Sequence, residues 1–159
     1  MELKISKLCI FLQVISIIYM ILRIVRYILN TAGIIVDSSG IDKLYIVYGA
    51  LTFIFVQFIF ILQLYNERST IKNIRVNTYD KLKAAKTNCI TDLIFTIIIA
   101  IRSLAGYYMV LSGCEFYIGN HIICIFMACV IIIKFITNII LIKNVTQYNL
   151  PYKEIVEEN

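Results

Sequence analysis

Apolar residues gather in four long runs along this chain, and shorter polar segments separate them. The runs cover approximately residues 8–29, 44–65, 89–111 and 122–142. A helix needs about 20 mostly apolar residues to cross the hydrocarbon core of a bilayer. The pattern therefore predicts an all-α membrane protein with four transmembrane helices, arranged as two hairpins in a single domain that covers residues 1–159.

The polar segment between the second and third runs, residues 66–88, joins the two predicted hairpins and carries the densest positive charge. Its basic residues are Arg68, Lys72, Arg75, Lys81, Lys83 and Lys86. Loops rich in Lys and Arg stay on the cytoplasmic side of a membrane. Lys4, Lys7, Lys143 and Lys153 would then lie on the same side. The charges predict a multi-pass protein of the cell membrane, with both termini and the acidic tail, residues 143–159, in the cytoplasm.

The same basic segment has a helical order. At 100° per residue one face holds the basic side chains of Arg68, Lys72, Arg75, Lys83 and Lys86, next to an apolar stripe of Ile71, Ile74, Leu82 and Ala85. This pattern predicts an amphipathic helix that lies on the cytoplasmic leaflet and contacts anionic lipids. The alternative is a solvated basic loop that only fixes orientation, and the β-branched residues and Asn77-Thr78 favour it.

Composition supports a membrane protein and argues against a nucleic-acid partner. The 159 residues are 60% hydrophobic and 16% charged, and the net charge of +5 is concentrated in one segment. A nucleic-acid-binding domain would usually be more basic overall. The first apolar run resembles the core of a signal peptide, but it is long. Arg23 and Arg26 stand where a cleavage region is expected, which favours an uncleaved transmembrane helix.

Arg23, Asp92, Arg102 and Lys134 fall well inside the predicted spans, and Arg26 lies near the end of the first span. An ionisable side chain within a membrane is costly and marks a functional hypothesis. At 1.5 Å per residue, Asp92 lies about one turn and Lys134 about two turns from the cytoplasmic surface. We therefore predict a buried ion pair between Asp92 and Lys134, assisted by Asn138 one turn below Lys134.

The two remaining arginines, Arg23 and Arg102, fall in the outer half of the predicted bundle, where no span contains an acid. Acids in the outer connections supply possible partners: Asp37, Asp42 and Glu115. If those acids do not fold inward, the two guanidinium groups form a site for an anion or a lipid headgroup. The alternative is that arginines near a helix end extend their charge to the membrane surface.

The five cysteines and the single histidine, His121, predict little chemistry. Cys114 and Cys124 are spaced to close a small disulfide in the second hairpin, although free thiols are the alternative. No CxxC pair is present, and no second histidine accompanies His121. We predict no metal site and no cofactor.

The sequence contains none of the familiar catalytic motifs. It lacks HExxH, a P-loop and a Gly-rich dinucleotide fingerprint, and its one histidine belongs to no Ser/His/Asp set. The expected function is therefore non-catalytic: an accessory, regulatory or immunity-type membrane component that packs with itself as a homo-oligomer or with a larger membrane partner. The alternative is a small transporter or ligand-binding bundle with the anion or lipid site at Arg23 and Arg102.

Overall fold

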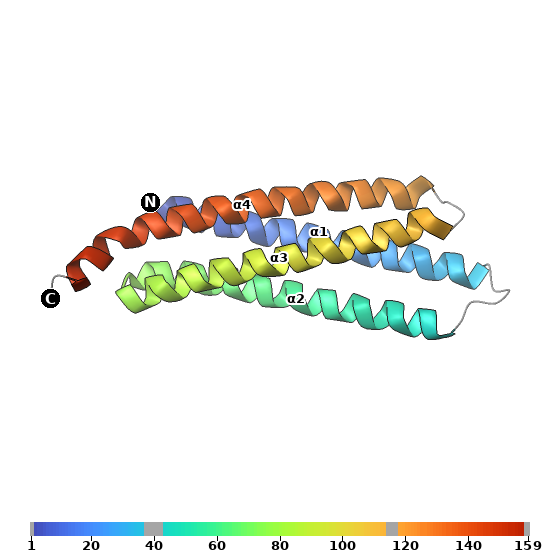
Figure 1. Ribbon diagram of the computed structural model, residues 1–159, viewed down its shortest axis with the longest axis horizontal. Coiled ribbons are helices and arrows are strands. Elements are labelled where there is room, and N and C mark those ends of the chain that lie inside the picture. The colour runs from blue at the N-terminus through green and yellow to red at the C-terminus, as the bar shows by residue number, and fades with distance from the viewer. Residues whose placement is uncertain (1, 37–42, 114–117, 158–159) are drawn as a thin grey trace.

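Four long helices account for nearly all of the chain that the structure, a computed structural model, describes. It describes residues 2–36, 43–113 and 118–157, with side chains placed at 2–29, 47, 49–104 and 122–148. The helices are α1 (Glu2–Val36), α2 (Lys43–Val76), α3 (Tyr79–Gly113) and α4 (Ile118–Glu157). They run in alternating directions (Figure 1). The backbone of each helix packs against two neighbours, in the cycle α1, α2, α3, α4. The result is a four-sided bundle.

Buried positions recur along every helix at alternating steps of three and four residues. They are Ile5, Cys9, Leu12, Ser16 and Tyr19 on α1; Val56, Phe60, Gln63, Glu67, Thr70 and Ile74 on α2; Leu82, Ala85, Cys89, Asp92, Thr96 and Ile99 on α3; and Cys124, Met127, Ile131, Lys134, Asn138, Leu141 and Val145 on α4. A repeat that averages 3.5 residues keeps one narrow stripe facing the neighbours, and it is typical of left-handed four-helix bundles.

The interior has two apolar clusters with a polar layer between them. We call the first the basic-end core: Ile5, Cys9, Leu12, Ile74, Leu82, Ala85, Cys89, Leu141 and Val145. The second, the far core, contains Tyr19, Val56, Ile59, Phe60, Ile99, Met127 and Ile131. Between them lies the polar layer, to which all four helices contribute: Ser16, Gln63, Glu67, Asp92, Thr96, Lys134 and Asn138. Polar side chains thus occupy the middle of the bundle's interior.

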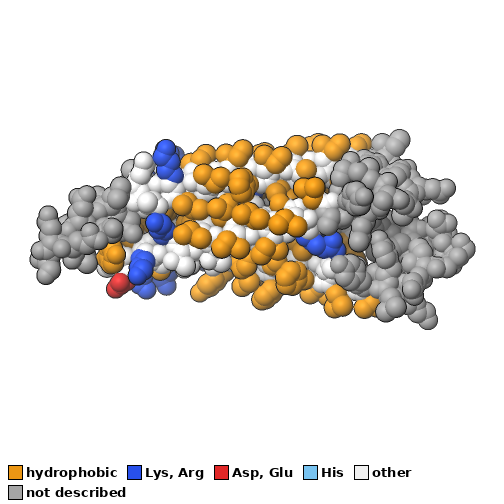
Figure 2. All heavy atoms as spheres, in the orientation of Figure 1, with side chains coloured by type: hydrophobic (Ala, Val, Ile, Leu, Met, Phe, Trp, Pro, Cys, Tyr) orange, Lys and Arg blue, Asp and Glu red, His pale blue; other side chains and the backbone are white. Residues whose placement is uncertain are grey.

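The outer surface is apolar in its middle, where the interior is polar. Large apolar side chains such as Ile21, Phe55, Ile101 and Phe126 are about half exposed or more. Figure 2 shows hydrophobic side chains covering the middle of the visible face, with most of the visible Lys and Arg side chains at one end, which we call the basic end. Soluble monomers rarely expose apolar surface so extensively. Each helix contains a stretch long and apolar enough to cross a membrane, within residues 2–29, 49–76, 79–104 and 122–148.

Residues 66–88 do not form the continuous amphipathic helix that the sequence predicts. They form the end of α2 and the beginning of α3, separated by a turn at Asn77 and Thr78. Asn77 has a φ of 55°, a left-handed conformation that asparagine tolerates better than most residues. The correction has a packing cause. The predicted apolar stripe is buried against α1 and α4 in the basic-end core, so it does not face a membrane surface.

The helices are longer than the predicted spans. They contain 34 to 40 residues, which corresponds to about 50–60 Å at 1.5 Å per residue, whereas a hydrocarbon core is about 30 Å thick. The predicted acidic tail is largely helical, because α4 continues through Pro151 to Glu157 and bends toward its C-terminal end (Figure 1). A proline removes one helical hydrogen bond and commonly bends a helix in this way.

Candidate functional site

The polar layer is centred on the ammonium group of Lys134, which is 3% exposed. Its Nζ donates to Glu67 Oε1 at 3.3 Å and to the hydroxyl of Ser16. It also lies 5.3 Å from the centroid of the Phe60 ring. Ser16 in turn donates its hydroxyl hydrogen to the Leu12 carbonyl, at 2.8 Å. One lysine therefore links α4 to both α1 and α2.

A second set of polar contacts joins α2, α3 and α4 around Asp92. Asn66 Nδ2 donates to Asp92 Oδ1 at 2.9 Å, and Gln63 Nε2 donates to the Asp92 carbonyl at 2.9 Å. The Thr96 hydroxyl receives hydrogen bonds from Gln63 Nε2 at 3.0 Å and from Asn138 Nδ2 at 3.1 Å, and it donates to the Asp92 carbonyl at 2.8 Å. Each of these side chains is held at a buried position of the 3.5-residue repeat or beside one.

The prediction of a direct Asp92–Lys134 ion pair is corrected by this geometry. Lys134 pairs with Glu67, and Asp92 is instead hydrogen bonded to Asn66. Asp92, Lys134 and Asn138 nevertheless belong to one layer. Both Asp92 and Lys134 interact electrostatically with Glu67, so the two carboxyl groups and the ammonium group form a single charged cluster.

Glu67 is the residue that the sequence analysis missed. It follows Asn66 and begins a polar stretch, so hydropathy places it in the connecting segment. In the structure it is 1% exposed. The spacing from Phe60 through Gln63 to Glu67 was the signal that could have found it, because these steps of three and four continue the inward face of α2.

A second group of polar residues lies beyond the far core. The Tyr19 hydroxyl and Ser103 Oγ are 2.6 Å apart, and Arg23 lies beside Tyr19 with Arg26 and Arg102 as neighbouring charges. The guanidinium carbon of Arg23 lies 5.8 Å from the centroid of the Phe53 ring. The structure therefore brings the two predicted arginines, Arg23 and Arg102, into one electrostatic neighbourhood, and it adds Arg26.

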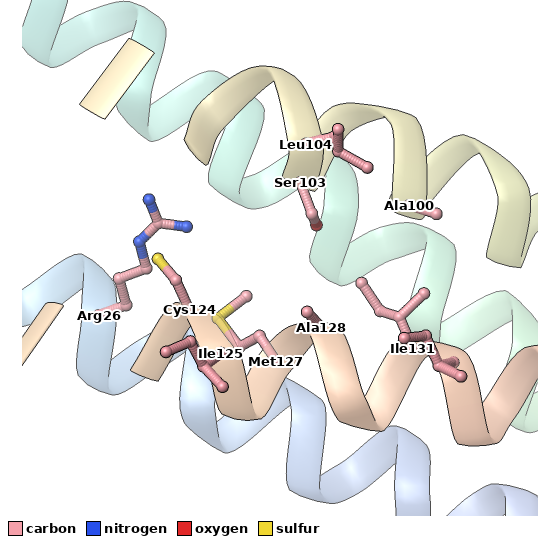
Figure 3. Close-up of a pocket in the computed structure, with 10 residues that line it drawn as sticks. Arg26, Ala100, Ser103, Leu104, Cys124, Ile125, Met127, Ala128 and Ile131 are labelled. Carbon is pink, nitrogen blue, oxygen red and sulfur yellow. The ribbon is translucent and has the colours of Figure 1, made fainter. Parts of the chain in front are cut away.

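A pocket of about 280 Å³ opens beside these arginines, between α3 and α4. Its walls are mostly apolar and are formed by Ala100, Leu104, Ile125, Met127, Ala128, Ile131 and Ile132, with Ser103 and Cys124. Figure 3 shows Arg26 reaching from α1 toward the space beside Cys124 and Met127. The Nε atom of Arg26 is buried, and no described residue accepts a hydrogen bond from it.

The basic residues predicted to contact lipid lie at one end of the bundle. Arg68, Lys72, Arg75 and Lys83 are exposed, and Lys86 is half-buried. They extend from the ends of α2 and α3 around the turn and do not lie on a separate surface helix. Contact with anionic lipid stays a prediction for this end.

The predicted disulfide involves a residue that the structure does not place. Cys124 is buried near the beginning of α4 and lines the pocket, whereas Cys114 lies outside the described residues, as do Asp37, Asp42 and Glu115. The disulfide between Cys114 and Cys124 therefore stays a prediction.

Comparison with protein-family models, with curated proteins and with solved structures found no match for this chain. The buried polar layer and the pocket beside the arginines are therefore the features that bear on function.

Proposed function

We propose that the chain is an integral membrane protein whose apolar belt lies in the bilayer, with the basic end on the cytoplasmic side. The exposed apolar side chains in the middle of all four helices support this placement, because a bilayer would cover them. The orientation follows from the exposed Lys and Arg side chains at the turn between α2 and α3.

Labelling of single cysteines tests this orientation. Lys81→Cys, at the basic end, should react with a membrane-impermeant maleimide only after the membrane is opened. Val47→Cys, an exposed position near the beginning of α2, should react in intact cells. Mass spectrometry identifies the labelled residue. Reaction of Lys81→Cys in intact cells would reverse the proposed orientation.

Within that membrane, we propose that the protein has a non-catalytic, accessory or regulatory role and binds an anionic lipid of the leaflet opposite the basic end. The observation that carries this proposal is the pocket between α3 and α4, with Arg26 at its side. Ligand pockets usually combine mostly apolar walls with a few polar groups that fix orientation. A volume of about 280 Å³ accommodates part of an acyl chain and leaves the headgroup outside.

Positive charge beside the pocket also favours an anionic lipid. Arg26 lines the pocket and interacts electrostatically with Arg23, which in turn neighbours Arg102. The described acids, Glu2, Glu67, Asp80 and Asp92, belong to the polar layer or to the basic end. The positive cluster thus favours an anionic headgroup, and the fork of a guanidinium group binds phosphate through paired hydrogen bonds.

Native mass spectrometry in a mild detergent tests lipid binding, with phosphatidylglycerol as the added probe and phosphatidylcholine as the neutral comparison. Arg26→Gln should weaken retention of phosphatidylglycerol about tenfold, since one charge-assisted hydrogen bond contributes about 1.5 kcal/mol or more. Ala128→Phe, which fills the pocket without changing the charge, should displace the lipid as well.

Lys143→Gln provides the control, because Lys143 is an exposed cation at the opposite end and is not among the residues predicted to contact anionic lipid. It should leave retention at the pocket unchanged. Equal retention of phosphatidylglycerol by wild type and by Arg26→Gln would contradict the proposal. Co-purification of a larger protein in place of lipid would move the function to that partner's interface.

A further inference from the structure

The charges of the polar layer do not balance. Glu67 and Asp92 supply two carboxyl groups, and Lys134 supplies the one cation among the described side chains that faces them. All three side chains are almost completely buried, at 1%, 1% and 3% exposure. If every group were ionised, the layer would hold a net charge of −1 inside a bundle with apolar cores on both sides. A buried net charge is expensive unless it is neutralised.

Several hydrogen-bond acceptors of the layer also have no donor in the part of the chain that the structure describes. Three of its buried oxygens receive no hydrogen bond from any described residue: Glu67 Oε2, Gln63 Oε1 and Asn138 Oδ1. Gln63 and Asn138 are both 0% exposed. All three atoms are acceptors, and the hydrogen bonds that Lys134, Asn66 and Thr96 donate go to other atoms. The layer therefore lacks one positive charge, and three of its acceptor oxygens lack a hydrogen bond from a described residue.

A proton would neutralise the excess charge and supply one further donor, and the available space favours it over a metal ion. One cavity that touches this layer is bordered by Thr96 and Lys134 and has a volume of only about 10 Å³, with otherwise mostly apolar walls. A cavity of this size holds at most about one water molecule. Within the described residues, His, Cys, Asp and Glu side chains do not gather in threes around a point where a metal could bind.

We propose that the polar layer is a proton-binding site in which the carboxyl group of Asp92 holds one exchangeable proton. Glu67 has the lysine as its direct partner and stays ionised. The carboxyl group of Asp92 contacts the neutral amide of Asn66 and faces the negative charge of Glu67. A proton taken up from water converts the Asp92 carboxylate to a neutral carboxylic acid, and the layer becomes electrically neutral.

Each neighbouring helix presents a limited set of titratable groups to this site. Cys9 faces it from α1, Glu67 from α2 and Lys134 from α4, while Cys89 precedes Asp92 by one turn on α3. Lys134 is the one cation among them. Loss of the proton therefore adds an uncompensated negative charge that all four helices must accommodate.

Stability should consequently depend on pH with a defined sign. The native state holds a proton that the opened, hydrated state releases, so stability is greatest when the site is protonated and falls as pH rises through the titration of the site. Relative to Asp92→Asn, which imitates the neutral form, the wild-type unfolding constant should rise by up to about tenfold per pH unit in that range, the slope for one proton.

Infrared spectroscopy tests the site directly in the wild-type protein. At neutral pH, where exposed carboxyl groups are ionised, the wild type should show the C=O stretch of a protonated carboxyl group, and this band should disappear at higher pH. Asp92→Asn should lack the band. Asp80→Asn, an exposed acid at the beginning of α3, is the matched control and should keep it.

The wild-type spectrum alone can overturn the proposal, even if Asp92→Asn fails to fold. Absence of a protonated carboxyl band at neutral pH would show that the layer holds no proton. Persistence of the band in Asp92→Asn, or its loss only in Glu67→Gln, would reject Asp92 as the residue that holds the proton. Parallel pH profiles of wild type and Asp92→Asn would reject the link to stability.

Discussion

Replacing Lys134 by methionine should lower the free energy of unfolding by about 3–5 kcal/mol at neutral pH, the usual effect of removing one partner from a buried ion pair. The change leaves Glu67 and Asp92 together without the cation that faces both of them. The loss should shrink as pH falls, because protonation neutralises the two carboxyl groups. Buried Cys9 and Cys89 supply the measurement, since the rate at which a thiol reagent modifies them reports opening of the bundle.

A second substitution identifies the partner of Lys134. Lys134→Met combined with Glu67→Gln should restore most of the lost stability, because both members of the contacting pair then become neutral. Lys134→Met combined with Asp92→Asn should restore less, since Glu67 would still be buried without a partner. Equal rescue by both combinations would argue against the specific pairing. Lys143→Met, an exposed lysine of the same helix, should change stability by less than about 0.5 kcal/mol.

Phe60→Ala should produce the second large loss of stability, about 3 kcal/mol. Phe60 is 1% exposed, packs against Tyr19 with ring centroids 4.9 Å apart, and lies under the Lys134 ammonium group. The substitution removes a buried ring from the far core and a cation–π contact that is worth up to about 2 kcal/mol when it is shielded from water. The same thiol-modification assay measures the change.

The neighbouring residue Phe58 is the control for this prediction. It is 56% exposed on the same helix, so Phe58→Ala should cost much less. Phe60→Leu should fall between the two, because it keeps most of the packing and removes only the ring beneath Lys134. Similar losses for Phe58→Ala and Phe60→Ala would mean that burial in the bundle does not decide stability.

Hydropathy alone was enough to predict the four helices and their order. Each apolar run corresponds to a helix with a membrane-length stretch. The ends of the helices were predicted poorly, because residues 66–88 and 143–157 are polar: the first were assigned to one surface helix and the second to a tail. In the structure both segments continue helices. Their buried positions, among them Glu67, Ile74 and Val145, follow the same repeat as the apolar middle.

The candidate site was predicted in part for a related reason. Asp92 and Lys134 stand out because they interrupt apolar runs, and helical spacing correctly places Asn138 on the side of Lys134. Their exact partners depend on how four helices are rotated about their axes, which no single helix determines. Glu67 is visible only when the 3.5-residue repeat of α2 is followed past the end of its apolar run.

The acids of the polar layer are synthesised before the lysine that faces them. Glu67 and Asp92 lie on α2 and α3, whereas Lys134 lies on α4, which leaves the ribosome after them. Until α4 arrives, the nascent bundle contains two acids and no lysine to face them. A chain that stops before α4 therefore lacks the ion pair between Lys134 and Glu67. Membrane proteases that recognise unpaired polar groups would have a direct means to tell such a chain from one that contains α4.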